Sequence, residues 1–171
     1  MHQSQPNVCI YPAISNHKEK LQDICNSWTN KIEVEGSNFD ETYIADSLEH
    51  KYLPPIEDAS KEHHYFMVIE IDKQIVGFFD MYLGYPSHNV AWIGMFLIDQ
   101  AYQKKSYGTL AMQYIERFVK EKGYCTMQLG VYHTNVKGLS FWIHTGFNHI
   151  QKFVHDKETQ RNILVLEKQI L

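Results

Sequence analysis

The sequence has no excess of basic residues and no long apolar run. Lys and Arg total 16 against 20 Asp and Glu, which gives a formal net charge of -4. Binding to nucleic acid requires a concentrated basic surface, so this balance argues against nucleic acid as the main partner and suits a cationic one better. The longest apolar stretch, residues 90–98, is too short to cross a bilayer. We therefore expect no membrane association.

Cysteine is also scarce. Cys9, Cys25 and Cys125 are odd in number and far apart, which predicts reduced, buried thiols rather than a disulfide framework. The histidines, His63, His64 and His88 among them, lack a second ligand pair at regular spacing, so no metal is expected. The opening residues are polar and do not resemble a signal peptide. These absences together predict a cytoplasmic protein.

The composition is that of one globular domain. The chain has 171 residues, 44% of them hydrophobic and 21% charged, which is enough for one good core but not comfortably for two. It contains no internal repeat, low-complexity tract or linker. We therefore treat residues 1–171 as a single domain.

The hydrophobic pattern predicts an α+β fold with a mixed central sheet. Strands are expected at residues 8–13, 65–71, 75–82, 90–98, 125–132, 147–155 and 162–170, and helices at residues 15–28, 40–52, 108–122 and 137–145. Ser15 or Asn16 would cap the first helix, and Pro54-Pro55 would stop the second. The result is a sheet of about six to seven strands flanked by about four helices.

Residues 90–98 are almost wholly apolar, as expected of a strand buried on both faces in the middle of a sheet. Residues 108–122 carry apolar side chains at helical spacing and stop at Gly123. The segment between them, Gln103 to Thr109, therefore joins a central strand to a helix start. That position makes the segment the most informative one in the chain.

A helix start of this kind can bind an anion. Its first N–H groups lack intrahelical partners, and the helix dipole places partial positive charge there. Ser106 and Gly108 would allow close approach, and Lys104 and Lys105 add charge. The alternative is a simple polar connection. The segment lacks the Gly-Lys-Ser/Thr end of a P-loop and the three glycines of a dinucleotide fold, which disfavours kinases and dehydrogenases.

The pattern Gln103-x-x-Ser106-x-Gly108 is similar to the Gln/Arg-x-x-Gly-x-Gly/Ala signature of the GNAT N-acetyltransferase superfamily, with Ser106 replacing the first glycine. Three other stretches resemble that superfamily in the right order: Ile10-Tyr11-Pro12-Ala13, Ile75-Val76-Gly77 and Asn135-x-x-Gly138-x-x-Phe141-Trp142-x-x-x-Gly146-Phe147. The resemblance covers about residues 8–171.

This resemblance implies acetyl-coenzyme A (acetyl-CoA) as cosubstrate, held in a gap between two splayed central strands. Backbone groups of the central strand would pair with the pantetheine arm, N–H groups from Lys104 to Thr109 would hold the pyrophosphate, and Asn135 would contact the pantetheine from the far side. The implied coenzyme-binding residues are Phe96, Leu97, Ile98, Gln103, Lys104, Lys105, Ser106, Tyr107, Gly108, Thr109, Asn135 and Trp142.

The resemblance further implies direct acetyl transfer to a primary amine of a small molecule or a protein. Trp142 stands where many relatives carry a tyrosine that protonates the leaving thiolate, and Trp92 and Gly130 stand where some relatives carry a base glutamate. An indole N–H cannot act as a general acid. We therefore predict Tyr132 and His133 as the catalytic residues. Other candidates near the expected cleft are His144, Asp80 and Tyr82.

Two alternatives remain open at this point. One is a protein of the same fold that binds acetyl-CoA but has lost the chemistry, and the other is an unrelated α+β domain. The resemblance implies that the acceptor pocket is built from residues 28–56 and 84–90, with Trp28, Tyr85 and Trp92 as lining candidates. The acceptor itself is left unassigned, and a homodimer formed through an edge strand is left open.

Overall fold

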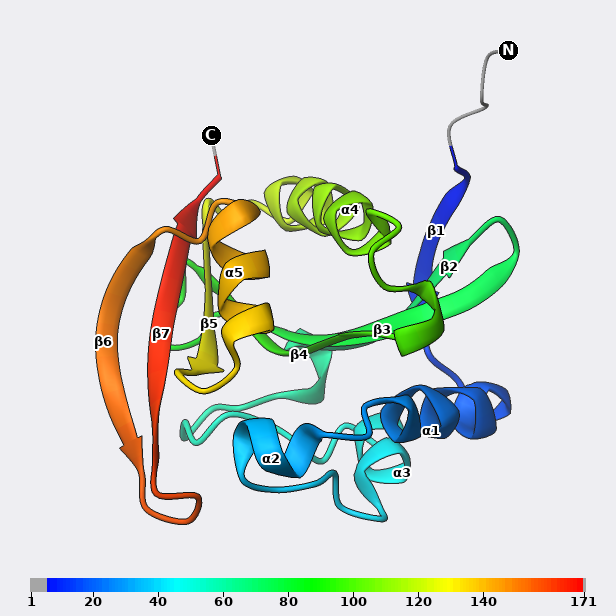
Figure 1. The fold of residues 1–171 in the computed structure, drawn as a ribbon. Coiled ribbons are helices and arrows are strands. Elements are labelled where there is room, and N and C mark those ends of the chain that lie inside the picture. Colours follow the sequence, from blue (N-terminus) through cyan, green and yellow to red (C-terminus); the bar gives the residue numbers. More distant parts are fainter. Residues whose placement is uncertain (1–5, 171) are drawn as a thin grey trace.

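The computed structural model describes residues 6–170 and has a seven-stranded sheet at its centre (Figure 1). The strands lie in the order β1-β2-β3-β4-β5-β7-β6, and only β4 and β5 run parallel to each other. Their bounds are β1 Val8–Pro12, β2 His64–Ile71, β3 Gln74–Leu83, β4 Val90–Ile98, β5 Thr126–Tyr132, β6 His149–Asp156 and β7 Arg161–Gln169. The predicted mixed sheet is confirmed.

Helices cover both faces of this sheet. In Figure 1, α1, α2 and α3 lie on one side of β3 and β4, and α4 and α5 lie on the other. Their bounds are α1 Lys18–Ser27, α2 Lys31–Glu35, α3 Tyr43–Leu48, α4 Tyr107–Glu121 and α5 Val136–His144, with 3-10 turns at Ser15–His17, Lys61–His63 and Gln100–Tyr102. No helix within residues 6–170 is long and apolar enough to span a membrane.

Each face of the sheet carries its own apolar core. Side chains alternate along a strand, so the neighbours Phe78 and Phe79 point to opposite faces. Phe78 packs with Leu21 and Ile24 of α1, while Phe79 belongs to the larger cluster formed with α4 and α5. The sheet therefore separates two compartments, and a group on one face reaches the other only where the sheet is interrupted.

Several local features follow the expected turn chemistry. Asp72 and Lys73 connect β2 to β3, and both have left-handed backbone conformations, with φ of 50° and 66°. This is the conformation that a two-residue hairpin turn requires. Gly123, with φ of 86°, ends α4 as predicted.

The structure differs from the predictions mainly before residue 64. The helix α2 was not expected, and α3 is shorter than the predicted helix at residues 40–52. It ends before His50, whose φ of 55° breaks the helix well ahead of Pro54. Neither Ser15 nor Asn16 caps the first helix, because both lie within the 3-10 turn at Ser15–His17 and the N-cap position of α1 falls on His17.

The thiol prediction was partly wrong. Cys25 is buried, as expected, but Cys9 is only partly buried and Cys125 is exposed. Cys125 precedes β5, where the chain leaves the surface to enter the sheet.

Candidate functional site

The sheet is interrupted at its centre. β4 and β5 pair only from Val90 to Ile93 on one strand and from Thr126 to Leu129 on the other. Beyond these pairs both strands continue, to Ile98 and Tyr132, without pairing to each other. The predicted splay is therefore present. It leaves one side of the β4 backbone at residues 94–98 without a neighbouring strand.

Gly94 forms a β-bulge at the start of this opening. In the β3–β4 ladder Met81 pairs with Ile93 and Asp80 pairs with Met95, so Gly94 is the extra residue. It is exposed although it lies in the middle of the sheet, which breaks the continuous burial that the sequence predicted for this strand. A Cβ atom at Gly94 would overlap the Asp80 carboxyl group. A side chain at this position would therefore force the Asp80 carboxyl group to move.

The segment from Gln103 to Thr109 leads from the end of β4 into α4. The Leu110 N–H donates to the Ser106 carbonyl at 3.0 Å, so the N–H groups of residues 107–109 precede this helical hydrogen bond. Lys104 and Ser106 adopt left-handed conformations, with φ of 61° and 62°. Ser106 is the position at which the segment departs from its signature, and its conformation is one that favours glycine.

Aromatic packing fixes this helix start against the opening. Phe96 of β4 stacks on Phe141 of α5 with ring centroids 5.5 Å apart. A Cβ atom at Gly108 would lie 3.1 Å from the Phe141 ring. Trp142 packs against Phe96, Phe141 and Phe147 and is buried in the core. Its indole therefore packs against the Phe96 ring, which borders the opening.

Two other predicted coenzyme-binding residues already have partners in the protein. The Gln103 Nε2 donates to the Ile98 carbonyl at 3.0 Å, which ties the segment to the end of β4. The Asn135 Oδ1 accepts from the Gly138 N–H at 2.9 Å and caps α5, while its Nδ2 donates to Glu35 at 3.0 Å. These contacts fix the Gln103 side chain at the end of β4 and the Asn135 side chain at the start of α5.

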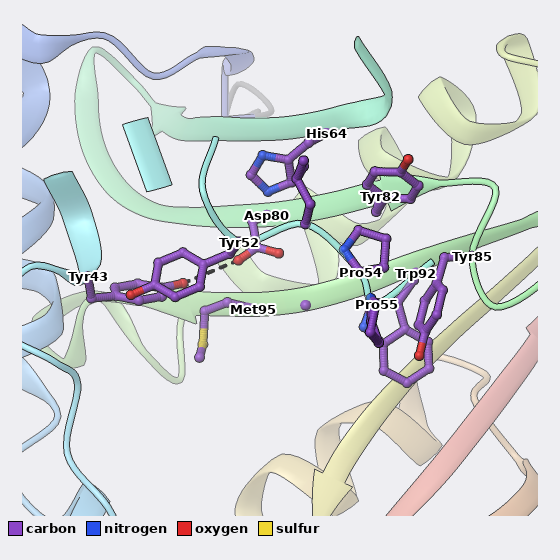
Figure 2. A pocket seen from close by; sticks show the side chains of 12 residues that line it. Tyr43, Tyr52, Pro54, Pro55, His64, Asp80, Tyr82, Tyr85, Trp92 and Met95 are labelled. Atoms are coloured by element: carbon purple, nitrogen blue, oxygen red, sulfur yellow. Dashed lines mark hydrogen bonds between the residues drawn. The ribbon is translucent and has the colours of Figure 1, made fainter. Parts of the chain in front are cut away.

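A cavity of about 350 Å³ lies on the face of the sheet that carries α3 (Figure 2). Aromatic and apolar side chains dominate it, and the residues that line it are Tyr43, Tyr52, Leu53, Pro54, Pro55, His64, Asp80, Tyr82, Tyr85, Trp92, Gly94 and Met95. Both segments predicted to build the acceptor pocket contribute to the lining. Trp28 lies elsewhere and packs against Phe39.

Asp80 is the one carboxylate among the described residues that line this cavity. Its Oδ2 accepts from the Tyr43 hydroxyl at 3.2 Å, a contact visible in Figure 2, and its carboxylate also accepts from the N–H groups of Gly94 and Met95. Burial raises the pKa of Asp80 to about 7, and the three hydrogen bonds oppose this shift without cancelling it. Asp80 can thus gain and lose a proton near neutral pH.

His64 is a second polar group in the cavity wall. Its Nδ1 lies 2.8 Å from the Nδ1 of His50, while its Nε2 is buried and has no hydrogen-bond partner among residues 6–170. Burial, assisted by His50, lowers the pKa of His64 to about 4, so the ring is neutral at physiological pH. The Nε2 is thus a buried polar atom whose hydrogen-bonding capacity is unused among the described residues.

The structure does not place Tyr132 or His133 in the lining of this cavity. The Tyr132 hydroxyl donates to Asp156 Oδ2 at 2.6 Å, and burial together with this bond raises the pKa of Tyr132 to about 12. His133 is exposed, and its Nδ1 accepts from the Asn162 N–H at 3.2 Å. Both lie at the end of β5, across the opening from β4, and their catalytic roles stay predictions.

Replacing Gly94 with alanine should destabilise the protein by about 1–3 kcal/mol, because the added methyl group and the Asp80 carboxyl cannot occupy the same space. The same replacement made in an Asp80→Ala background should cost much less, since the obstructing carboxyl is then absent. Urea unfolding of the two single variants and the double variant measures this coupling. Equal costs in both backgrounds would contradict the proposed contact.

Comparison with known proteins agrees with this geometry. The model of the acetyltransferase (GNAT) family matches residues 28–147. Similar solved structures include an acetyltransferase from Thermus thermophilus (19% identity, 96% of this chain and 97% of that one, TM-score 0.72) and Ard1 from Thermoplasma volcanium (17%, 96% and 98%, 0.70). A third is the PaiA N-acetyltransferase from Thermoplasma acidophilum in complex with coenzyme A (20%, 95% and 99%, 0.64). No protein of curated function matches.

Proposed function

The chain belongs to the acetyltransferase (GNAT) family, and from this premise we propose that it transfers the acetyl group of acetyl-CoA directly to a primary amine. The acceptor would be a small molecule or a protein amino group. Direct transfer places the thioester carbonyl carbon beside the amine nitrogen, so that one bound complex contains both reactants. The acceptor class is taken up in the next subsection.

The interrupted pairing of β4 and β5 carries this proposal. Beyond Met95, β4 offers backbone N–H and C=O groups on the side that lacks a strand, and an extended pantetheine arm has amide groups that can pair with them. The start of α4 follows β4 through residues 99–106 and presents N–H groups that suit a pyrophosphate. Both features supply backbone N–H groups as donors. The presence of Ser106 in place of the signature glycine therefore leaves these donors in place.

The proposed coenzyme contacts are those predicted from the sequence. Phe96, Leu97 and Ile98 would pair through their backbones, and the segment from Gln103 to Thr109 would hold the pyrophosphate. Asn135 keeps its proposed role at the far side of the opening, where its side chain is already oriented by Glu35 and Gly138. Trp142 would act through Phe96 and Phe141, because its own ring is buried.

Two measurements test the proposed function. Saturating acetyl-CoA should raise the melting temperature, since a ligand that binds only the folded state stabilises it. Free thiol should then be released when the protein is incubated with acetyl-CoA and a panel of alkylamines, amino alcohols, polyamines and N-terminal peptides. Thermal stabilisation without turnover on any amine would favour a binding protein that has lost the chemistry. The absence of any stabilisation would contradict coenzyme binding itself.

A further inference from the structure

The cavity and the segment from Gln103 to Thr109, called the α4 loop from here on, lie on opposite faces of the sheet and meet at its interruption. The α4 loop belongs to the face covered by α4 and α5, whereas Tyr43 of α3 belongs to the other face (Figure 1). Gly94 and Met95, which line the cavity, also begin the unpaired part of β4. A thioester held along this part of β4 would therefore be accessible from the cavity.

We propose that this cavity binds a small primary alkylamine as the acetyl acceptor and that Asp80 is the general base that deprotonates it. The inference rests on the proposed function, because it assigns the acceptor side of the same reaction. It names Asp80 as a catalytic residue and Tyr43 as the residue that positions its carboxylate.

The cavity wall suits a cationic amine of limited size. Its volume of about 350 Å³ lies near the lower end of the range for small-molecule sites. The rings of Tyr43, Tyr52, Tyr85 and Trp92 can attract an ammonium group through their faces, and Asp80 supplies the opposite charge. No lysine or arginine occurs among the described lining residues to repel it.

The contacts of Asp80 suit proton transfer from the acceptor. The bulge at Gly94 leaves no room for a side chain and brings two backbone N–H groups to the carboxylate, while Tyr43 donates from the other side. A carboxylate has four lone-pair positions, so three such donors leave it one further acceptor position. An ammonium or a bridging water in the cavity can use that position.

The titratable groups around Asp80 are Tyr43 from α3, Tyr52 from the segment after it, His64 from β2 and Tyr82 from β3. Burial raises the pKa values of Tyr43 and Tyr52, and His64 is neutral, so none of these three is charged near pH 7. Asp80, with a pKa of about 7, is thus the group in this wall that changes charge near neutral pH. The same apolar wall lowers the pKa of a bound ammonium by removing water, which brings the two groups closer in proton affinity.

The proton balance is complete without another reactant. The ammonium gives one proton to the Asp80 carboxylate, and the neutral nitrogen attacks the thioester carbonyl carbon to form the new C–N bond. As the C–S bond breaks, its electron pair stays on sulfur. The second nitrogen proton leaves with collapse of the intermediate and ends on the coenzyme thiolate. Asp80 then returns its proton to solvent.

His64 narrows the class of acceptor further. Its buried Nε2 lacks a partner, and an unpaired buried polar atom costs free energy unless a ligand or water pairs with it. Figure 2 shows the ring on the same side of the sheet as Asp80 and Tyr82, at the wall of the cavity. Because this nitrogen has almost no exposed surface, an amine with a second polar group, such as an amino alcohol or a diamine, pairs with it only when the ring turns toward the cavity. We expect such amines to be preferred over simple alkylamines of equal length.

The Asp80→Asn variant tests the assignment directly. It should bind acetyl-CoA as the native protein does and lose at least about 100-fold in kcat/KM for alkylamines, because general base catalysis typically contributes about 10²–10⁴-fold. The rise of kcat/KM with pH through about 7 should also disappear. Asp23→Asn, an identical change at an exposed position on α1, is the matched control and should leave rate and profile unchanged.

A comparison of amines separates a base from a merely structural carboxylate. An acceptor that is already neutral at the assay pH, such as a hydrazine or a fluorinated alkylamine, needs no base before it attacks. The Asp80→Asn variant should therefore lose much less activity with these acceptors than with alkylamines. An equal loss for both kinds of acceptor would overturn the assignment.

Tyr43→Phe provides a second variant in case Asp80→Asn fails to fold. It removes a hydrogen bond that favours the ionised carboxylate, so the acid limb of kcat/KM should move to higher pH while coenzyme binding persists. An unmoved limb would count against the role of Asp80. Loss of the limb in His133→Ala instead would transfer the role to His133.

The outcomes also separate this inference from the proposed function. Native protein that acetylates no amine would overturn both. Native protein that acetylates amines at a rate independent of Asp80 would overturn this inference alone. Acetylation of N-terminal peptides in strong preference to small amines would overturn the assignment of the acceptor class.

Discussion

The Asp80→Asn variant should gain stability relative to the native protein as the pH rises from about 4 to about 8. The native carboxyl has a pKa of about 7 against an ordinary value of 3.8, so between these values the folded protein holds a proton that the unfolded chain releases. The unfolding free energy of the native protein therefore falls as the pH rises through this window. Asparagine does not titrate in this range. The unfolding free energy of Asp80→Asn should therefore rise relative to that of the native protein as the pH rises.

The size of this effect follows from the same shift. Moving a carboxyl pKa from 3.8 to about 7 corresponds to about 4 kcal/mol, reached once the pH exceeds the folded value. In a chain of this length the difference in Tm would change by about 10 °C across the range. Melting curves of both proteins at a series of pH values measure it.

Two comparisons make this result specific. His64 acts in the opposite direction, since its lowered pKa of about 4 reduces the unfolding free energy as the pH falls below about 6.5, but it is present in both proteins and cancels in their difference. The Asp23→Asn control should show no pH-dependent difference from the native protein. A difference between Asp80→Asn and native protein that stays constant from pH 4 to 8 would show that Asp80 has an ordinary pKa.

The second large effect is expected at the start of α4, where Gly108→Asp should abolish most coenzyme binding. The new carboxylate would lie among the N–H groups proposed for the pyrophosphate, and placing like charges together costs several kcal/mol. A loss of about 3 kcal/mol corresponds to about 100-fold in Kd. The side chain would also press on Phe141, which lies 3.1 Å from an added Cβ atom. Titration calorimetry with coenzyme A measures the change.

Two controls separate charge from disturbance of the helix. Gly123→Asp places the same residue at the other end of α4, where nothing lies within 4 Å of an added Cβ atom. It should lower stability, because the φ of 86° at Gly123 strains any side chain and a negative charge at a helix C-terminus opposes the dipole, but it should keep coenzyme affinity. Gly108→Ser adds bulk without charge and should lose less than Gly108→Asp. Equal Kd values for the native protein and Gly108→Asp would exclude the pyrophosphate from this loop.

The strands and the longer helices could be predicted because their patterns are regular. The apolar, β-prone runs of β2, β3 and β4 and the helical spacing of α4 each report burial that depends on nearby residues. The segment from Ala13 to Ser60 was less predictable. There α2 and α3 are only five and six residues long, too short to establish a period, and a left-handed His50 ends α3 without a glycine or proline at that position.

The coenzyme side of the site was also more predictable than the acceptor side. The α4 loop is contiguous in sequence, and the groups proposed to bind the pyrophosphate are its backbone N–H groups. The cavity instead brings together Tyr43, His64 and Asp80 from three separate elements. Only the sheet register shows that His64 and Asp80 share a face, and only the packing of α3 brings Tyr43 to it. One local signal was present: Asp80 is a lone carboxylate inside an otherwise apolar strand. The role proposed for Asp80 depends on the bulge at Gly94, and no sequence pattern predicts this bulge.

The opening between β4 and β5 gives this sheet an edge in its middle. Strand edges with unpaired N–H and C=O groups are templates on which other chains can add, and proteins usually shield them. Here the aromatic rings of Phe96 and Phe141 and the start of α4 narrow access to the inner edge. A bound pantetheine arm would complete that shielding. A coenzyme bound as proposed would thus close an inner strand edge as well as take part in the reaction.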